Sequence, residues 1–354
     1  MGQAEYTVVD VDAHYMDHVD DVFEYLDDDD PWKARFEGEI TRRKDQIGAV
    51  WPKDSGPGSH MEFERDDFRT REDVRAAMDK LGVDKVLLIG QQMLNIPSGG
   101  GMDKRKIKYT EAYVEFLLDR IASPADGIYV TIPVVHTDPE VTADHINRWG
   151  DEEAVVAVCV VPKFVEPPFG NRRYDPIYDA CVEQELPVVF HSAGSAVDQY
   201  HLKGFETHLA TDHLGFLVTT MNTMTSVIAQ GVPERFPSLD IVFEETGLFY
   251  IPLMMYRLDM YYLMMPDDAP LLEKLPSEYM KEFYYGTQPV EQVPDPRYFE
   301  YIFEMIGGVD NLMYATDWPH LDYDEQNVVT DLPFLSDAEK ARILGGTAEE
   351  VFGI

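Results

Sequence analysis

Short apolar runs recur along the whole chain, and segments with helical periodicity separate them. Each run is only a few residues long, is rich in Val, Ile or Tyr, and lacks strict alternation of apolar and polar positions. Continuous apolar strands of this kind are buried on both faces, which is typical of a parallel sheet. The expected strands are Tyr6–Val11, Lys85–Ile89, Ile128–Pro133, Ala154–Val160, Pro187–Phe190, Asp240–Phe243, Phe283–Gly286 and Leu312–Thr316.

Amphipathic helices are expected between these strands. The clearest are Arg71–Leu81, Tyr109–Ile121, Pro139–Trp149, Ile177–Gln184 and Tyr298–Ile306. Eight strands with helical crossovers predict an α/β fold, a (β/α)8 TIM barrel that forms a single domain over residues 1–354. A doubly wound sheet is the competing architecture. Loop insertions rich in Gly, Pro and charged residues are expected after strands one and two, at Asp28–Phe68 and Ile96–Lys108.

The chain is strongly acidic, with 66 acidic and 29 basic side chains and a formal net charge of −37. Because 45% of the residues are hydrophobic, the chain can fill a large core, and disorder is excluded. The negative charge argues against nucleic-acid and anionic membrane partners. Such a charge repels itself in dilute buffer and is screened in concentrated salt, which suggests a halophilic host with a cytoplasm of high ionic strength.

The cysteine content and the first residues of the sequence bear on the cellular location of the protein. The two cysteines, Cys159 and Cys181, are too few for a disulfide scaffold or a cysteine-based zinc cluster. No run approaches the ~20 apolar residues of a membrane span. The first residues lack the basic and apolar regions of a signal peptide. We therefore expect a cytoplasmic protein.

Acidic and imidazole side chains follow three of the predicted strands. Strand one runs into Asp12 and His14, which share a face with Asp10 in an extended chain. Strand five runs directly into His191, and strand eight runs into Asp317. Because barrel active sites form at the carboxyl ends of the strands, we expect Asp12, His14, His191 and Asp317 to meet at one rim. Two imidazoles and two carboxylates suit one divalent ion, zinc in preference to manganese, with an open position for water or substrate.

Several longer motifs occur in order along most of the chain. They are residues 10–14 (DVDAH), 170–178 (GNRRYDPIY), 186–191 (LPVVFH), 234–243 (ERFPSLDIVF), 245–247 (ETG), 257–259 (RLD), 305–308 (MIGG), 315–320 (ATDWPH) and 346–352 (GTAEEVF). In this combination the sequence resembles the amidohydrolase superfamily. It is most similar to the amidohydrolase-related branch that includes aminocarboxymuconate semialdehyde decarboxylase and the resorcylate and carboxyvanillate decarboxylases. The first loop insertion finds little counterpart there.

The resemblance implies a mononuclear metal centre held by the four strand-end residues Asp12, His14, His191 and Asp317. One departure concerns the end of strand six, where several members of the branch place a histidine that contacts the catalytic water or the substrate. This sequence has Glu245 at that point. Glu245 is a candidate acid or base beside Asp317 and His191, or a structural partner of Arg257, and the structural role is slightly preferred.

Three further histidines and one neighbour of Asp317 are weaker candidates for substrate contact. His320 follows Asp317 by three residues. His213 lies with His201 and His208 in the loop and helix after strand five, which overhang the barrel mouth in this fold. At most one of these three is expected to orient the substrate.

Two reactions are compatible with this centre. In the first, a metal-activated water attacks an amide, lactone or ester of a small organic acid, with Asp317 passing on the proton. In the second, which also occurs in the resembled branch, the metal chelates the carboxylate of an aromatic or unsaturated acid that then loses CO2. Because the strand-six histidine is missing, hydrolysis is preferred and decarboxylation is the alternative. A catalytically silent binding barrel is a third possibility, and it would predict a missing ligand.

Other features bear on partners. A cluster of methionines and tyrosines at residues 254–265 is interpreted as packing or as a subunit interface, and the resemblance favours a homo-oligomer. A Gly-rich phosphate loop is not seen after any predicted strand, so nucleotide chemistry is not supported. The expected partner is a small-molecule substrate.

Overall fold

A computed structural model describes residues 6–15, 19–27, 33, 69–90, 93–94, 103–163, 165–192, 208–320 and 322–354. Eight strands form one parallel sheet in the order of the sequence, from β1 to β8. They are β1 (Val9–Tyr15), β2 (Lys85–Gly90), β3 (Ile128–Pro133), β4 (Val155–Val160), β5 (Val188–His191), β6 (Ile241–Glu244), β7 (Tyr284–Gly286) and β8 (Leu312–Met313).

The first and last strands meet and nearly close the sheet into a barrel. The Val11 amide donates to the Tyr314 carbonyl oxygen (3.1 Å), and the Asp317 amide donates to the Asp12 carbonyl oxygen (2.7 Å). Ala13 and Trp318 also form a parallel bridge. The prediction of a (β/α)8 barrel is therefore confirmed, and the doubly wound alternative is wrong because each strand pairs with its sequence neighbours.

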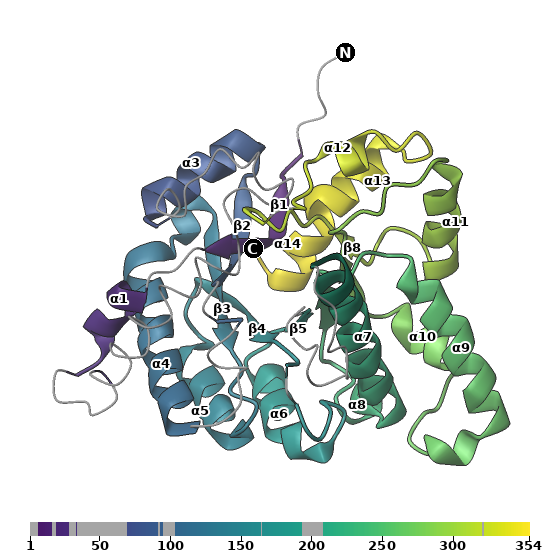
Figure 1. Cartoon of the computed structure of the whole chain (residues 1–354), viewed down its shortest axis with the longest axis horizontal. Coiled ribbons are helices and arrows are strands. Elements are labelled where there is room, and N and C mark those ends of the chain that lie inside the picture. Colours follow the sequence, from purple (N-terminus) through teal and green to yellow (C-terminus); the bar gives the residue numbers. More distant parts are fainter. Residues whose placement is uncertain are drawn as a thin grey trace.

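Helices alternate with the strands and cover the outside of the barrel (Figure 1). The α-helices are α1 (Val19–Val22), α3 (Arg71–Leu81), α4 (Asp103–Phe116), α5 (Pro139–Trp149), α6 (Asp175–Glu183), α7 (His208–Ala229), α8 (Val232–Arg235), α9 (Tyr250–Met264), α10 (Pro276–Met280), α11 (Arg297–Ile306), α12 (Asn327–Thr330), α13 (Asp337–Ala341) and α14 (Thr347–Phe352). Shorter turns are the π-helical segments Leu117–Ile121 and Arg342–Gly346 and the 3-10 segments Phe23–Tyr25, Pro124–Asp126, Arg172–Tyr174 and Pro266–Asp268.

The predicted loop Ile96–Lys108 extends further along the chain than the loop in the structure. Helix α4 begins at Asp103, so the last residues of the expected Ile96–Lys108 loop are helical. Lysine and arginine are good helix formers, and Lys106 packs its chain into the buried side of the helix. The first predicted insertion, Asp28–Phe68, lies outside the described residues apart from Lys33.

The core has two layers, one inside the barrel and one between the strands and the helices. Val9, Val11, Val189 and Val242 belong to the buried cluster inside the barrel. The outer layer depends on close approach of helix and strand at Gly90, where a Cβ atom would lie 1.7 Å from the Tyr113 hydroxyl of α4. The barrel is therefore filled at its base, which leaves its upper rim for the chemistry.

Candidate metal centre

The four predicted strand-end residues come together at the upper rim of the barrel. Asp12 and His14 lie in β1, His191 ends β5, and Asp317 follows β8. His14 Nε2 lies 3.4 Å from Asp12 Oδ1 and 2.9 Å from Asp317 Oδ1. His191 Nε2 lies 3.4 Å from the same Asp12 oxygen. All four side chains are at most 1% exposed, so they form one buried cluster of two imidazoles and two carboxylates.

A register shift in β1 decides which of its acids joins the cluster. Between Asp10 and Ala13 the strand advances three residues while β2 advances two, from Val86 to Leu88. An extra residue of this kind reverses the alternation of side chains beyond it. The prediction that Asp10 shares the face of Asp12 and His14 is therefore wrong.

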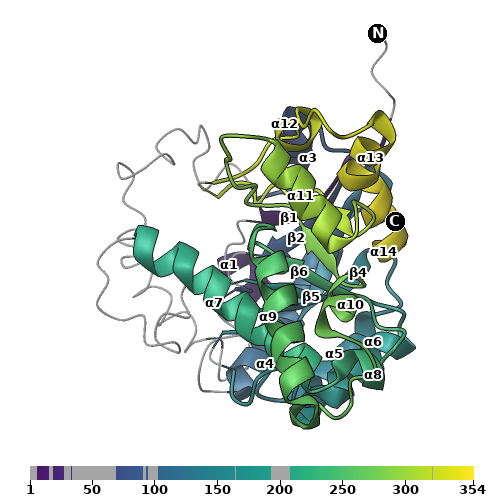
Figure 2. The same ribbon diagram turned by 90° about the vertical axis from the view of Figure 1, so that its right-hand side faces the viewer.

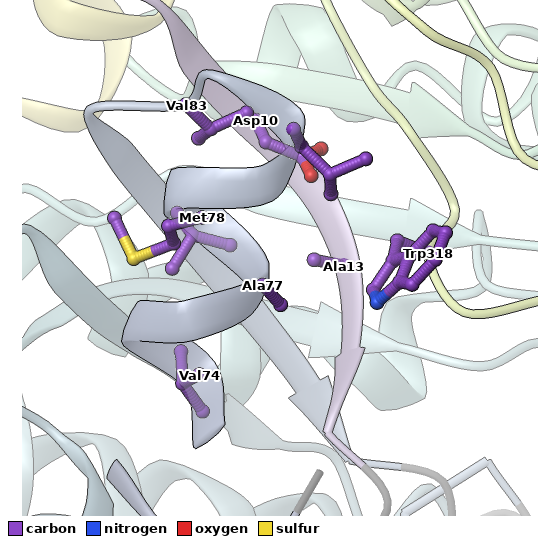
Figure 3. A pocket seen from close by; sticks show the side chains of 9 residues that line it. Asp10, Ala13, Val74, Ala77, Met78, Val83 and Trp318 are labelled. Atoms are coloured by element: carbon purple, nitrogen blue, oxygen red, sulfur yellow. The ribbon is translucent and has the colours of Figure 1, made fainter. Parts of the chain in front are cut away.

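Asp10 lies on the outer side of the strand, where it holds β1 to the residues after β8. It accepts hydrogen bonds from the Thr316 amide (2.8 Å) and the Thr316 hydroxyl (2.5 Å). Burial raises its pKa to about 8, although the Thr316 hydrogen bonds act in the opposite direction. Asp10 also lines a small pocket between β1 and α3, together with Ala13, Met78 and Trp318 (Figure 3). This pocket is otherwise apolar and lies behind the strand that carries Asp12.

Glu245 and His320 extend the cluster toward the mouth of the barrel. His320 Nδ1 lies 2.7 Å from Asp317 Oδ1, and Glu245 Oε2 lies 3.4 Å from His191 Nδ1. Ligand atoms of His14, Glu245, Asp317 and His320 all lie within 4.8 Å of one another, as do those of Asp12, His14 and His191. Glu245 thus faces the cluster.

The preferred structural role of Glu245 is wrong. Arg257 lies on the exposed side of α9, and the contact of Glu245 in the described chain is with His191 instead. The backbone of Glu245 is left-handed, with a φ of 59°, and its side chain lies beside His191 at the end of β5.

The cluster contains buried polar atoms that a cation would satisfy. Among the described residues, both carboxylate oxygens of Asp12 and the Nε2 atoms of His14 and His191 lack a hydrogen-bond partner. His191 Nδ1 lies 2.7 Å from the carbonyl oxygen of Ser192, which can only accept, so Nδ1 carries the proton and Nε2 has a free lone pair. Neutral imidazole nitrogens and carboxylate oxygens are the ligands that zinc and manganese bind. The residues present therefore fit one divalent ion.

The shifted pKa values of the cluster also favour a bound cation. Burial, with the charge of His320, holds the pKa of His14 well below its ordinary value, so His14 is neutral. Burial and the charges of Asp317 and Asp12 raise the pKa of Glu245 well above its usual range. Burial and the charge of Asp12 likewise raise the pKa of Glu244. Carboxylates packed this closely in a buried pocket favour either protons or a bound cation.

Gln288 is a contact that the sequence reasoning missed. It lies two residues after β7, is fully buried, and donates from Nε2 to Asp317 Oδ2 (3.2 Å) and to the Asp322 carbonyl oxygen (3.3 Å). Its amide oxygen has no partner in the described chain. Looking for any polar residue after every strand, rather than only for acids and imidazoles, would have found it.

The other predicted contacts are less defined. His320 does contact Asp317, and burial pulls its pKa down, but the charge of Asp317 and their hydrogen bond raise it above the ordinary value. His213 and His208 lie in α7, but their side chains are outside the described part, as is all of His201.

Cys159 and Cys181 are buried and free. Within the described residues, the search for membrane-spanning helices finds none of sufficient length and apolar character.

Comparison with known proteins gives a match over nearly the whole chain. The family model described as "Amidohydrolase" (Amidohydro_2) matches residues 9–354. None of the curated protein sequences matches at a significant level.

Solved structures share the fold at low sequence identity. An amidohydrolase of Mycobacterium avium subsp. paratuberculosis K-10 is 19% identical, with a TM-score of 0.76 over 99% of this chain and 100% of the other. A dihydroxybenzoic acid decarboxylase of Polaromonas sp. JS666, with bound manganese and 2-nitroresorcinol, is 17% identical, with a TM-score of 0.71 over 99% and 97%. A 5-carboxyvanillate decarboxylase of Novosphingobium aromaticivorans DSM 12444, complexed with manganese, is 18% identical, with a TM-score of 0.71 over 99% and 96%.

Proposed function

We propose, from the premise that this chain belongs to the amidohydrolase family whose model spans residues 9–354, that it is a metal-dependent decarboxylase of a small aromatic acid. Membership of this family confirms the prediction of an enzyme. The sequence alone favoured hydrolysis, but the similar structures include decarboxylases crystallised with manganese, which support the carboxy-lyase alternative better. The observation that carries the proposal is the buried convergence of Asp12, His14, His191 and Asp317 with unpaired ligand atoms.

These four residues would hold one divalent ion, which we take to be manganese or zinc. When bound, the ion supplies the positive charge that holds a substrate carboxylate and stabilises negative charge on the reacting acid. His191 donates from Nδ1 to the carbonyl oxygen of Ser192, which fixes the orientation of the ring. Gln288 and His320 hold the Asp317 carboxylate from two sides.

Loss of CO2 from an aromatic ring requires a proton donor at the carbon that loses the carboxylate. The bond to the carboxylate breaks, its electron pair stays on the ring carbon, and a proton takes its place. Glu245 fits this role because burial and the charges of Asp317 and Asp12 raise its pKa well above the usual range of a glutamate, which favours the protonated form that can donate. It is buried and faces the cluster rather than solvent.

The experiment that tests this function compares two reactions of the manganese-loaded enzyme. CO2 release from dihydroxybenzoates and carboxyvanillate is measured beside hydrolysis of lactones and amides of matched size. We expect CO2 release, and we expect Glu245→Gln to lower kcat by about 100-fold or more while the manganese content stays unchanged. Glu300→Gln, on the exposed side of α11, is the matched control and should retain full activity.

Each adverse outcome has a definite meaning. Lactone or amide turnover without CO2 release would replace decarboxylation by hydrolysis. Full activity in Glu245→Gln would remove Glu245 from the chemistry while leaving the metal centre in place.

A further inference from the structure

The loop between β6 and α9, residues 245–249, carries Glu245 on a strained backbone. Glu245 has a φ of 59° and Gly247 has a φ of 69°, so the chain turns left-handed twice between residues 245 and 247. A left-handed backbone at a residue other than glycine persists only where its surroundings impose it. Helix α9 begins directly after this loop, and the side chain of its N-cap residue, Phe249, makes no capping hydrogen bond. We therefore looked for contacts from other elements that hold the loop.

Glu291, in the segment after β7, accepts hydrogen bonds from two successive amides of this loop. The Leu248 amide donates to Glu291 Oε2 (3.3 Å), and the Phe249 amide donates to Glu291 Oε1 (3.2 Å). Both amides lie at the N-terminus of α9, where the helix dipole also favours a negative charge. Glu291 thus binds the loop from the connection that follows the neighbouring strand.

Gly247 allows the two segments to come this close. A Cβ atom on Gly247 would lie 2.6 Å from Glu291 Oε1 and 2.8 Å from the Pro289 carbonyl oxygen, which is closer than a side-chain carbon tolerates. The Gly247 amide also donates to the Gln288 carbonyl oxygen (3.2 Å). Three successive amides, those of residues 247–249, therefore all bind the segment 288–291.

The segment 288–291 also contacts the metal cluster. The Gln288 side chain donates to Asp317 Oδ2 (3.2 Å), while its carbonyl oxygen binds the loop. A further contact to the loop comes from α7, where the Thr220 hydroxyl lies 2.7 Å from that of Thr246. Helices α7 and α9 pack against each other on the face turned toward the viewer in Figure 2. The segment 288–291 therefore sets the position of the loop relative to the expected metal ligand Asp317.

We propose that Glu291 is a positioning residue of the active site, which holds the loop in the conformation that keeps Glu245 beside the metal cluster. The inference rests on the proposed function, because it takes Glu245 as the proton donor. Glu291 acts through the loop, since its hydrogen bonds in the described chain come from Leu248 and Phe249. Catalysis is sensitive to such placement, because a displacement of about 1 Å costs about 100-fold in rate.

A purely structural role would have a different consequence. If Glu291 only stabilised the start of α9, its removal would lower the Tm and leave the kcat of the folded enzyme unchanged. A positioning role instead lowers kcat while substrate and metal still bind, because the donor alone is displaced.

Steady-state kinetics of the manganese-loaded enzyme separate these two roles. We expect Glu291→Ala to lower kcat about 10-fold or more, with KM and the manganese content unchanged. Glu291→Gln keeps one of the two acceptor oxygens and should recover part of the loss. Glu339→Ala is the matched control, because it removes a carboxylate that accepts the Ser336 amide at the start of α13 (2.8 Å), and it should keep full kcat. Full kcat in Glu291→Ala would overturn the proposal.

A double variant shows whether Glu291 acts through Glu245. In Glu245→Gln the donor is already lost, so the addition of Glu291→Ala should lower kcat by no more than about twofold. A further loss as large as that of Glu291→Ala in the wild type would show that Glu291 acts on another part of the site, and it would overturn the proposal.

Amide hydrogen exchange of the chelator-treated protein gives a readout that needs neither metal nor substrate. We expect the amides of residues 247–249 to exchange about 10-fold or more faster in Glu291→Ala, while those of β6 and β7 keep their protection because the variant is folded. Unchanged exchange in the loop would overturn the proposal. Hydrolysis of lactones without CO2 release would instead overturn the proposed function, and the kcat comparison on the lactone and the exchange of the loop would still decide the role of Glu291.

Discussion

Two carboxylates at the rim of the barrel have left-handed backbones. Glu245 has a φ of 59° and Asp317 has a φ of 62°, both in the region that favours glycine. Such conformations cost about 1 kcal/mol or more each and persist where the surroundings impose them. The conformation of Asp317 is held by two contacts. Its amide donates to the Asp12 carbonyl oxygen, and Gln288 donates to its side chain. The strain aims both carboxylates at the cluster, which is consistent with a functional role.

Gln288 gives the first prediction. Gln288→Leu removes the amide that donates to Asp317 Oδ2, so the carboxylate loses the contact on that oxygen and keeps those of His14 and His320 on Oδ1. We expect the dissociation constant for Mn²⁺ to rise about 10- to 100-fold, as for other residues that orient a metal ligand. Isothermal titration of the chelator-treated protein measures it. Gln230→Leu, which removes a comparable amide contact to Ser226 at the end of α7, is the control. Equal affinities in the wild type and Gln288→Leu would show that Asp317 is held without Gln288.

Strand β1 carries two acids, Asp10 and Asp12, that have different roles. Its register shift turns Asp12 into the barrel and leaves Asp10 on the outer side, where Thr316 binds it. Asp10 therefore ties the first strand to the residues after the last one, beside the backbone bonds that close the sheet. Placement of Asp12 and Asp317 depends on this closure, because the two lie on strands that are far apart in sequence.

A pH experiment tests the role of Asp10. Its pKa in the folded protein is about 8, against 3.8 for an unperturbed carboxyl, so folding favours the protonated form. The stability that this group contributes is complete below about pH 4 and is lost as the pH rises toward 8. In chelator-treated protein, we expect the Tm to fall between pH 5 and pH 8.5, and to fall less in Asp10→Asn. The raised pKa values of Glu244 and Glu245 also lower the Tm as the pH rises, and they do so in the wild type and in Asp10→Asn alike. Parallel Tm curves for the two would contradict the assignment.

The sequence was sufficient for the fold and for most of the cluster. The apolar runs gave all eight strands, because strands buried on both faces have a strong local signature. Asp12, His14, His191 and Asp317 could be found because chemistry in a barrel gathers at strand ends. The register shift of β1 could not be predicted, since it depends on pairing with β2 rather than on local composition. The contacts of Gln288 and Glu245 likewise depend on loop backbones that only the assembled barrel fixes.

The net charge of −37 is the dominant electrostatic feature of the protein. The acidic side chains repel one another both within one chain and between copies. Both effects change with salt, since the screening length falls from about 10 Å at 0.1 M to about 3 Å at 1 M. The working state of the protein is therefore expected to depend on ionic strength.

Thermal unfolding in increasing salt tests this expectation. We expect the Tm to rise between 0.05 M and 2 M KCl, because screening removes repulsion that weakens the compact state. A Tm that does not change with KCl would refute the halophilic hypothesis.

The metal content of the protein decides whether four side chains from three strands hold one cation. Elemental analysis of protein equilibrated with Mn²⁺ and then desalted should give one ion per chain for the wild type. Asp12→Asn and His191→Ala should retain less than a tenth of that amount while their circular dichroism is unchanged. Asp10→Asn, in the same strand but on its outer side, should retain the full amount. One ion per chain in both Asp12→Asn and His191→Ala, or none in the folded wild type, would contradict the claim.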